Sequence, residues 1–236
     1  MKGEIFPVDE NLIGKNMIGG LPLIDFFAGD FDLVEPKKYF LKLLEVAGEK
    51  ISSETKAIAQ MVEDGALDFE KILRNSFSNL DETEDELDNK LNGESLDLVE
   101  LLAEESLRPH LERVAEKYGE IINRSGWSQG YCPICGKEPK IGEIKEEEEE
   151  QHYLFCHQCG FKWSFTPIRC PFCGDAGYLA YFTVDGEERY RLDVCNMCKR
   201  YIKMVDFRDS SSQVNLDVED IATLHLDIIA YEEGYN

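Results

Sequence analysis

The sequence predicts an α+β fold with an N-terminal helical bundle, two tandem four-cysteine modules and a C-terminal helix. Residues 1–125 contain no cysteine and carry apolar residues at helical spacing. All eight cysteines follow residue 131, in four Cys-x-x-Cys pairs among short β-prone runs such as HYLFC, FKWSF, YLAYFTV and RYRLDVC. We therefore expect a helical domain over 1–125, the cysteine modules over 126–208, and a C-terminal helix over 209–236 that packs on the rest.

The N-terminal bundle follows from several apolar-periodic segments. PKKYFLKLLEVAGEK predicts a helix with Pro36 in its first turn, an end near Gly48 and a core face of Phe40, Leu43, Leu44 and Ala47. SETKAIAQMVEDG and LDFEKILRNSF predict two shorter helices, and the acidic SNLDETEDELDNKLNGES predicts a solvated connection or an exposed helix.

The last part of this region, SLDLVELLAEESLRPHLERVAEKYGEIINR, predicts a long helix that Pro109 should kink or divide in two. Its apolar stripe contains Leu98, Leu101, Leu102, Leu111, Val114, Ala115, Tyr118, Ile121 and Ile122. Residues of this kind indicate core packing rather than chemistry.

The closing segment LDVEDIATLHLDIIAYEEGYN predicts one helix. Asp217 is a suitable N-cap and Gly234 a suitable end. The expected apolar face consists of Ile221, Leu224, Ile228 and Ile229.

The cysteines follow a near-repeat of one unit. Their spacing is C-x2-C-x20-C-x2-C, then ten residues, then C-x2-C-x21-C-x2-C. Each unit should bring two pairs together across a short β-hairpin, as in a zinc ribbon or a rubredoxin. Gly136, Gly160 and Gly174 follow three of the pairs, where a tight turn needs positive φ, whereas Lys199 follows the fourth and leaves its geometry open.

Cys-x-x-Cys spacing lets both sulfurs reach one ion in tetrahedral geometry, so the sequence predicts two metal ions per chain, zinc or iron. The repeat favours sequential pairing over an interleaved alternative. The expected ligands are Cys132, Cys135, Cys156 and Cys159 at one site and Cys170, Cys173, Cys195 and Cys198 at the other. His152 and His157 are interpreted as solvated loop residues. Four thiolates leave no open position for substrate, which argues against catalysis by these metals.

The charge balance excludes several classes of partner. The net charge is −23, and both residues 1–130 (−14) and 131–236 (−9) are acidic. Such a surface repels a phosphate backbone and an anionic membrane. No apolar stretch long enough for a membrane span and no secretory signal is visible, and unvaried Cys-x-x-Cys spacing is not that of a disulfide framework. We expect a soluble protein of a reducing compartment whose thiols hold metal.

A run of five glutamates, 146–150, lies between the first two cysteine pairs. The stretch Lys145–Gln151 is expected in a loop of the first unit, solvated and mobile. Its sign disfavours nucleic acid there and leaves a protein partner as the simplest use of this unit.

Several motifs together resemble the formate dehydrogenase accessory (formation) proteins, the FdhE family. The resemblance covers roughly residues 127–235 and includes CPICGKEP, YLFCHQCGFKWSFTPIRCPFCG, ERYRLDVCNMCKRYIK and DVEDIATLHLDIIAYEEGY. It includes features that a generic zinc ribbon does not need, among them Pro139, Trp163, Arg169, Tyr201 and Lys203.

The resemblance implies a cytoplasmic maturation factor rather than an enzyme. Such a factor associates with the catalytic subunit of a molybdenum- or tungsten-dependent formate dehydrogenase and is needed for its activity, and its paired rubredoxin-like sites are linked to iron. A homodimer is a further possible assembly. The residues expected to contact the partner are Arg169, Lys199, Arg200 and Tyr201.

Three other hypotheses stay open. A rubredoxin-like electron-transfer protein would use iron at the four-cysteine sites. A transcription-type zinc ribbon has only the basic cluster Lys199, Arg200 and Lys203 in its favour. Thiol–disulfide catalysis would need a Cys-x-x-Cys pair free of metal, and four similar pairs argue against it.

Overall fold

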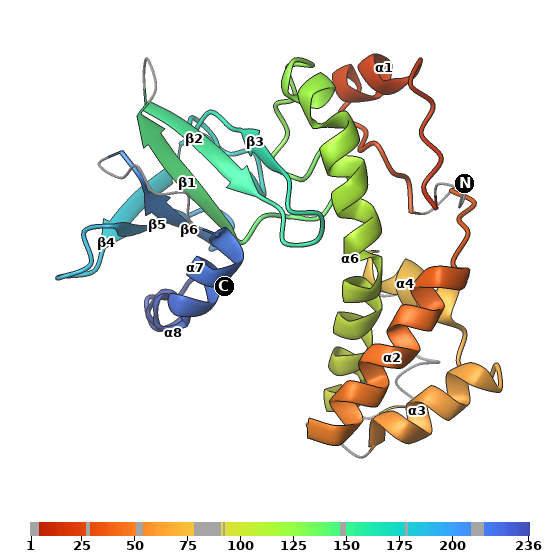
Figure 1. Ribbon diagram of the computed structural model, residues 1–236. Helices are drawn as coiled ribbons and strands as arrows, with labels where there is room; N and C mark the ends of the chain where they lie inside the picture. Colours follow the sequence, from red (N-terminus) through yellow and green to blue (C-terminus); the bar gives the residue numbers. More distant parts are fainter. Residues whose placement is uncertain are drawn as a thin grey trace. The chain divides into compact units, whose positions relative to one another are not determined.

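The computed structural model describes residues 5–26, 29–50, 54–77, 91, 93–146, 150–177, 179–208 and 215–236. The chain forms two compact units (Figure 1). The first contains Met1–Val8 and Ile24–Val114, and the second contains Asp9–Leu23 and Ala115–Asn236. The limits expected at residues 125 and 208 stay predictions. The acidic connection over 78–90 and the three central glutamates 147–149 lie outside the described residues.

The first unit is helical. It contains α2 (Val34–Lys50), α3 (Glu54–Glu63) and α4 (Phe69–Ser76), which match the three predicted helices, although α2 continues past Gly48. The predicted core residues Phe40, Leu44 and Ala47 are buried, and the Phe40 ring packs 5.1 Å from that of Phe69. The short α1 (Ile13–Ile18) belongs to the second unit and was not predicted, since six residues carry little periodic signal.

The long helix α6 (Gly93–Asn123) passes through Pro109 without interruption. Of the two outcomes predicted for this proline, division of the helix is wrong, and a kink stays a prediction. A proline removes one backbone hydrogen bond, whereas the buried side chains on both sides of it hold the helix together. The buried stripe is Val99, Ala103, Leu107, Leu111, Val114, Tyr118 and Ile122, and the predicted members Leu101 and Ile121 are about half exposed.

The second unit is built on one six-stranded sheet. Its strands are β1 (Ile141–Glu146), β2 (Glu150–Phe155), β3 (Lys162–Ser164), β4 (Leu179–Thr183), β5 (Tyr190–Cys195) and β6 (Tyr201–Asp206). The spatial order is β3-β2-β1-β6-β5-β4, and only the central β1–β6 pair is parallel. Each cysteine module thus contributes an antiparallel three-stranded ribbon, and the two ribbons join side by side.

This topology places both cysteine modules at one end of the sheet. The first and third cysteine pairs precede β1 and β4. The second and fourth pairs come where β2 and β5 end, before β3 and β6, and each hairpin therefore carries its two pairs at its open end. Because β1 and β6 run in the same direction, the ends that carry the pairs coincide. Lys145, Glu146, Glu150 and Gln151 lie at the opposite end and are strand residues, not loop residues as expected.

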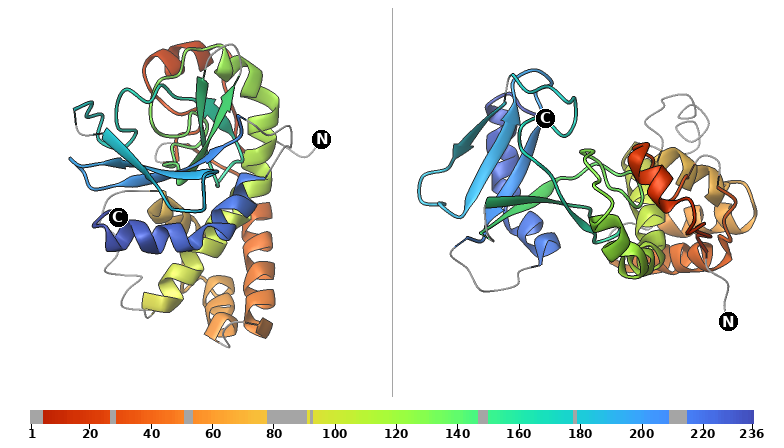
Figure 2. Two further views of the ribbon diagram at one scale, coloured as in Figure 1. Left: turned by 90° about the vertical axis from the view of Figure 1, so that its left-hand side faces the viewer. Right: turned by 90° about the horizontal axis from the view of Figure 1, so that it is seen from above.

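Two helices, α7 (Leu216–Ala222) and α8 (Leu224–Glu232), cover one face of the sheet (Figure 2). Leu216 packs with Ile141, Phe155 and Val205, while Leu226 and Ala230 pack with Leu192 and Val194. The single predicted helix is broken at Thr223, whose hydroxyl donates to the Glu219 carbonyl at 2.7 Å. Asn215, not Asp217, is the N-cap, and its side chain accepts from the Asp217 N–H.

The predicted apolar face of the C-terminal helix is wrong. Ile221, Leu224 and Ile228 are exposed, and Ile229 is the only one of the four that packs against the sheet. Polar contacts explain the orientation. Lys203 of β6 is buried and lies 2.6 Å from the Asp220 carboxylate and 2.7 Å from that of Asp227. This pairing turns the acidic side of α7 and α8 toward the sheet.

None of the helices in the described ranges is both long enough and apolar enough to cross a membrane.

Candidate metal centres

All four cysteine pairs adopt the same turn. In each, the N–H of the first cysteine donates to the carbonyl five residues later, as from Cys132 to Lys137 at 2.9 Å. The N–H four residues after that cysteine donates back to its carbonyl, as from Gly136 to Cys132 at 3.0 Å. The same two bonds recur after Cys156, Cys170 and Cys195. This turn brings the two thiols of each pair to the same side.

The turn needs positive φ at the residue that follows each pair. Gly136, Gly160 and Gly174 have φ of 77°, 68° and 75°. Lys199 has φ of 61° and is the only non-glycine with positive φ among the described residues. The fourth turn, left open from the sequence, therefore has the geometry of the other three, although an L-residue is strained there.

The eight cysteines form two clusters, and the grouping is the sequential one favoured by the repeat. One contains Cys132, Cys135, Cys156 and Cys159, and the other Cys170, Cys173, Cys195 and Cys198. Within each cluster the sulfur atoms all lie within 4.8 Å of one another. All eight cysteines are free thiols.

The sulfur positions fit a tetrahedral metal site. With metal–sulfur bonds of about 2.3 Å, the sulfurs of such a site are about 3.8 Å apart. The Cys170–Cys198 and Cys173–Cys195 pairs are each 3.7 Å apart, and the Cys132–Cys159 and Cys135–Cys156 pairs are each 3.4 Å apart. Each cluster could therefore hold one ion. Four thiolates suit zinc and iron alike, so the donor set does not select between them.

The pKa values of the clustered thiols indicate what a bound cation would supply. Burial, and then hydrogen bonding among the thiols, raise the pKa of Cys135 well above its ordinary value. At Cys156 burial opposes ionisation, but hydrogen bonds from Cys132, Cys135 and Cys159 outweigh it and lower the pKa. In the second cluster burial raises the pKa of Cys170 to about 12. Packed thiols thus resist ionising together, and a cation is what allows four thiolates to coexist.

The two clusters differ in exposure. All four cysteines of the first are buried, whereas Cys173 is exposed and Cys198 half-buried in the second. Ile134, Phe161 and Trp163 are buried around the first cluster. In the first turn of this cluster the Pro133 carbonyl accepts a hydrogen bond from the Leu23 N–H at 2.8 Å. Chain segments distant in sequence therefore enclose the first cluster.

The four predicted partner-contact residues lie near the second cluster or the strands that follow it, and all make contacts within the chain. Arg169 donates to the Ser128 carbonyl, and Arg200 makes a bidentate pair with Glu138 (2.9 and 2.7 Å) while lying 3.6 Å from the Phe172 ring centroid. The Tyr201 hydroxyl donates to Asp227 at 2.7 Å, and burial and then this carboxylate raise the pKa of Tyr201 above its ordinary value. Lys199 is exposed, 5.4 Å from the Tyr235 ring centroid.

His152 and His157 are less solvated than expected, and only His157 lies outside a strand. His152 is buried in β2, with its Nε2 2.9 Å from Glu150. His157 lies in the second turn of the first module, with Nδ1 3.1 Å from an Asp217 carboxylate oxygen and Nε2 3.5 Å from one of Asp220. The α7 helix supplies these acidic partners, a long-range contact that the sequence did not indicate.

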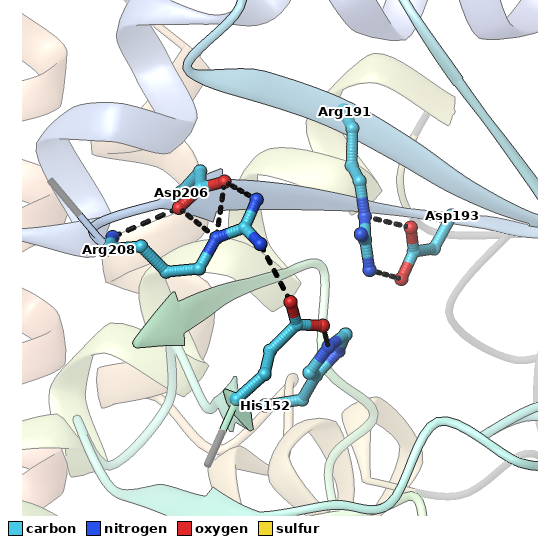
Figure 3. A network of polar contacts seen from close by, with 6 residues as sticks. His152, Arg191, Asp193, Asp206 and Arg208 are labelled. Carbon is cyan, nitrogen blue, oxygen red and sulfur yellow. Dashed lines mark hydrogen bonds and ion pairs between the residues drawn. The ribbon is translucent and has the colours of Figure 1, made fainter. Parts of the chain in front are cut away.

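A pocket of about 260 Å³, which the sequence did not predict, lies on the sheet face opposite α7 and α8. Its apolar floor includes Leu154, Ile202 and Met204, and Cys170 and Cys195 reach its wall. Charged side chains on the same face form the network in Figure 3, in which Arg208 joins Asp206 to Glu150, and Glu150 contacts His152. The sequence signal for this charged face was the alternation of charged residues in RYRLDVC.

Arg191 and Asp193 form a second pair at this pocket, with contacts of 2.7 and 3.2 Å (Figure 3). Burial raises the pKa of Asp193, and the hydrogen bond from Arg191 opposes that effect. The charges on this face are therefore mostly paired with one another.

The comparison with protein families matches these modules. Residues 131–166 match the model of the FdhE central domain, and residues 168–236 match that of the FdhE C-terminal domain. The two cysteine modules of the chain are thus similar to the central and C-terminal domains of the FdhE family. The first four-cysteine module spans the central domain and the second lies in the C-terminal domain of this family.

Individual relatives extend this result. The Protein FdhE homolog of Aquifex aeolicus is 29% identical over 231 residues, which are 96% of this chain and 74% of that protein. Protein FdhE of Escherichia coli (strain K12 / DH10B) is 28% identical over 119 residues, 50% of this chain and 38% of that protein. The crystal structure of the FdhE protein from Pseudomonas aeruginosa has the same fold, with a TM-score of 0.66 at 20% identity, covering 100% of this chain and 79% of that one.

Proposed function

We propose that this protein is a cytoplasmic maturation factor, not an enzyme, for a molybdenum- or tungsten-dependent formate dehydrogenase. It binds the catalytic subunit of that enzyme and is needed for its activity. The similarity of both cysteine modules to FdhE domains supports this proposal, and the observation that carries it is the pair of closed four-cysteine clusters.

Each cluster holds one ion, zinc or iron, in this proposal. Four thiolates complete a tetrahedral site, and the ion then has no free position for substrate. An ion in such a site stabilises the turns that present the surrounding side chains. The metal-bearing end of the sheet is thus a rigid surface for a protein partner.

We place part of the contact at the exposed second cluster. Lys199 is exposed, and Arg200 is half-buried beside it. Arg169 and Tyr201 stabilise the same region through hydrogen bonds to the Ser128 carbonyl and the Asp227 carboxylate. Arginine and tyrosine are common anchors of interfaces.

Charge reversal at Lys199 and Arg200 tests this contact. The Lys199→Glu/Arg200→Glu variant should lose capture of the catalytic subunit in a pull-down while both metal ions stay bound. Because Arg200 pairs with Glu138, a Glu138→Gln variant serves as the control for the lost internal ion pair and should retain capture. If the double variant captures the subunit and restores formate oxidation in a deletion strain, the contact lies elsewhere.

A second candidate function, electron transfer by iron at the clusters, is favoured by the exposure of Cys173 and Cys198. An exposed thiolate ligand offers an electron a short route to a partner, as in rubredoxins. Purification without oxygen followed by metal analysis and visible spectroscopy tests it. A colourless zinc protein that still supports formate dehydrogenase activity would exclude this candidate.

A further inference from the structure

The helices α7 and α8 expose an apolar stripe that their packing on the sheet does not use. It consists of Val218, Ile221, Leu224, Ile228 and Tyr231, which are 57–77% exposed. Their spacing of three or four residues places them along one side of both helices. We call this set the outer stripe.

The outer stripe is not the edge of the core. The residues that face the sheet are Leu216, Glu219, Thr223, Leu226 and Ala230, all buried. The outer stripe therefore lies on the side away from the sheet. Single exposed apolar residues are ordinary, but five in a row along one surface mark an interaction site in most monomeric proteins.

The charges around the outer stripe indicate what its partner carries. Residues 215–236 contain six acidic residues and no lysine or arginine. Asp220 and Asp227 share one cation, Lys203, and Glu232 and Glu233 are exposed at the end of α8. The stripe is thus bordered by excess negative charge. A complementary surface has apolar side chains flanked by lysine or arginine.

This requirement disfavours a surface of the same chain. The first unit has Lys+Arg 11 against Asp+Glu 24, a net charge of −13, and the second has 14 against 24, a net charge of −10. A second copy that packed stripe against stripe would bring together two surfaces that both carry this excess negative charge, which costs free energy.

We propose that the outer stripe docks the formate dehydrogenase catalytic subunit, through an apolar surface on that subunit flanked by basic side chains. The inference rests on the proposed function, whose partner it uses. The stripe is continuous with the second four-cysteine module, because beyond α8 the Tyr235 hydroxyl donates to Asn196 at 2.9 Å and the Asn236 N–H donates to the Lys199 carbonyl at 2.8 Å. The chain end that follows α8 therefore lies beside the fourth cysteine turn.

Two variants test the proposal by binding. Ile221→Ser/Ile228→Ser should weaken binding of the purified catalytic subunit to the full chain by about 30-fold or more, because apolar anchors at interface centres contribute most of the affinity. Ile18→Ser/Ile121→Ser is the matched control, since both isoleucines are exposed in the same unit but lie outside α7 and α8. It should bind as the native chain does. Circular dichroism and metal content should be unchanged in both.

Hydroxyl-radical footprinting of the native chain, alone and with the catalytic subunit, separates the possible occupants. The five side chains should be modified in the free chain and protected in the complex. Protection in the free chain would mean that the chain itself or a second copy covers the stripe, and this overturns the proposal. Binding without protection, or equal binding by the stripe variant, overturns it too while leaving the proposed function intact. If the native chain does not bind the subunit at all, the proposed function fails and the docking surface with it.

Discussion

The two four-cysteine sites share spacing, turn geometry and sulfur arrangement, yet they differ in surroundings. The first is enclosed by buried side chains and by the segment that contains Leu23, whereas the second exposes Cys173 and ends in a strained lysine. Local sequence thus determines the metal site, while residues far away in sequence determine its exposure. The first site has the surroundings of a structural centre, and the second has the exposure that the proposed partner contact requires.

Removing one cysteine pair from each site gives the largest expected difference. Cys132→Ser/Cys135→Ser should lose one ion and unfold the first ribbon, because a structural four-cysteine site contributes about 10–16 kcal/mol of apparent binding free energy. The helical signal of the first unit should be largely retained. Metal analysis with circular dichroism measures both effects.

The matched variant Cys170→Ser/Cys173→Ser should lose the other ion at a smaller cost in stability, since fewer buried side chains depend on that site. Two ions per chain in the Cys132→Ser/Cys135→Ser variant would contradict the assignment of the ligands. An equal loss of stability in the two double variants would contradict the distinction between the sites.

Removal of metal by a chelator measures the same difference kinetically. The surroundings of a site control solvent access and change metal affinity by about 10–100-fold. We therefore expect two phases of release in a chelator competition assay, with the second site losing its ion about tenfold or more faster. The Cys170→Ser/Cys173→Ser variant should lack the fast phase. A single phase in the native chain would show that exposure of Cys173 does not control release.

The sequence predicted the grouping of the cysteines better than the sheet that holds them. Cys-x-x-Cys spacing and the repeat are local features, so the grouping of Cys132 with Cys156 and of Cys170 with Cys195 followed from them. The parallel pairing of β1 with β6 joins strands about 60 residues apart, as in the Ile141–Lys203 pair, and no local pattern encodes it.

The C-terminal segment illustrates a second limit. Both sides of α7 and α8 carry apolar residues, so helical periodicity could not tell Leu226, which is buried, from Ile228, which is exposed. The choice is made by ion pairs to Lys203, a residue on another element. The partners of His157 could not be predicted either, because they lie on α7 and not in the turn that contains His157.

The smallest expected effect concerns the strained turn of the second site. An L-residue with positive φ costs about 1–2 kcal/mol, and glycine loses about 0.5–1 kcal/mol more backbone entropy on folding. Lys199→Gly should therefore raise the free energy of unfolding by about 1 kcal/mol or less, as measured by denaturant titration of the metal-bound chain.

The reciprocal change belongs at Gly174 in the same site, where a Cβ atom would meet nothing within 4 Å and φ is +75°. Gly174→Lys should cost about 1 kcal/mol from backbone conformation alone. Lys199→Ala keeps the positive φ but removes the contacts of the lysine with Tyr235 and Asn196, so it separates the two contributions. If Lys199→Gly and Lys199→Ala lower the free energy of unfolding equally, the lysine is retained for its contacts. The backbone strain at Lys199 then contributes too little to the stability of the second site to distinguish it from the first.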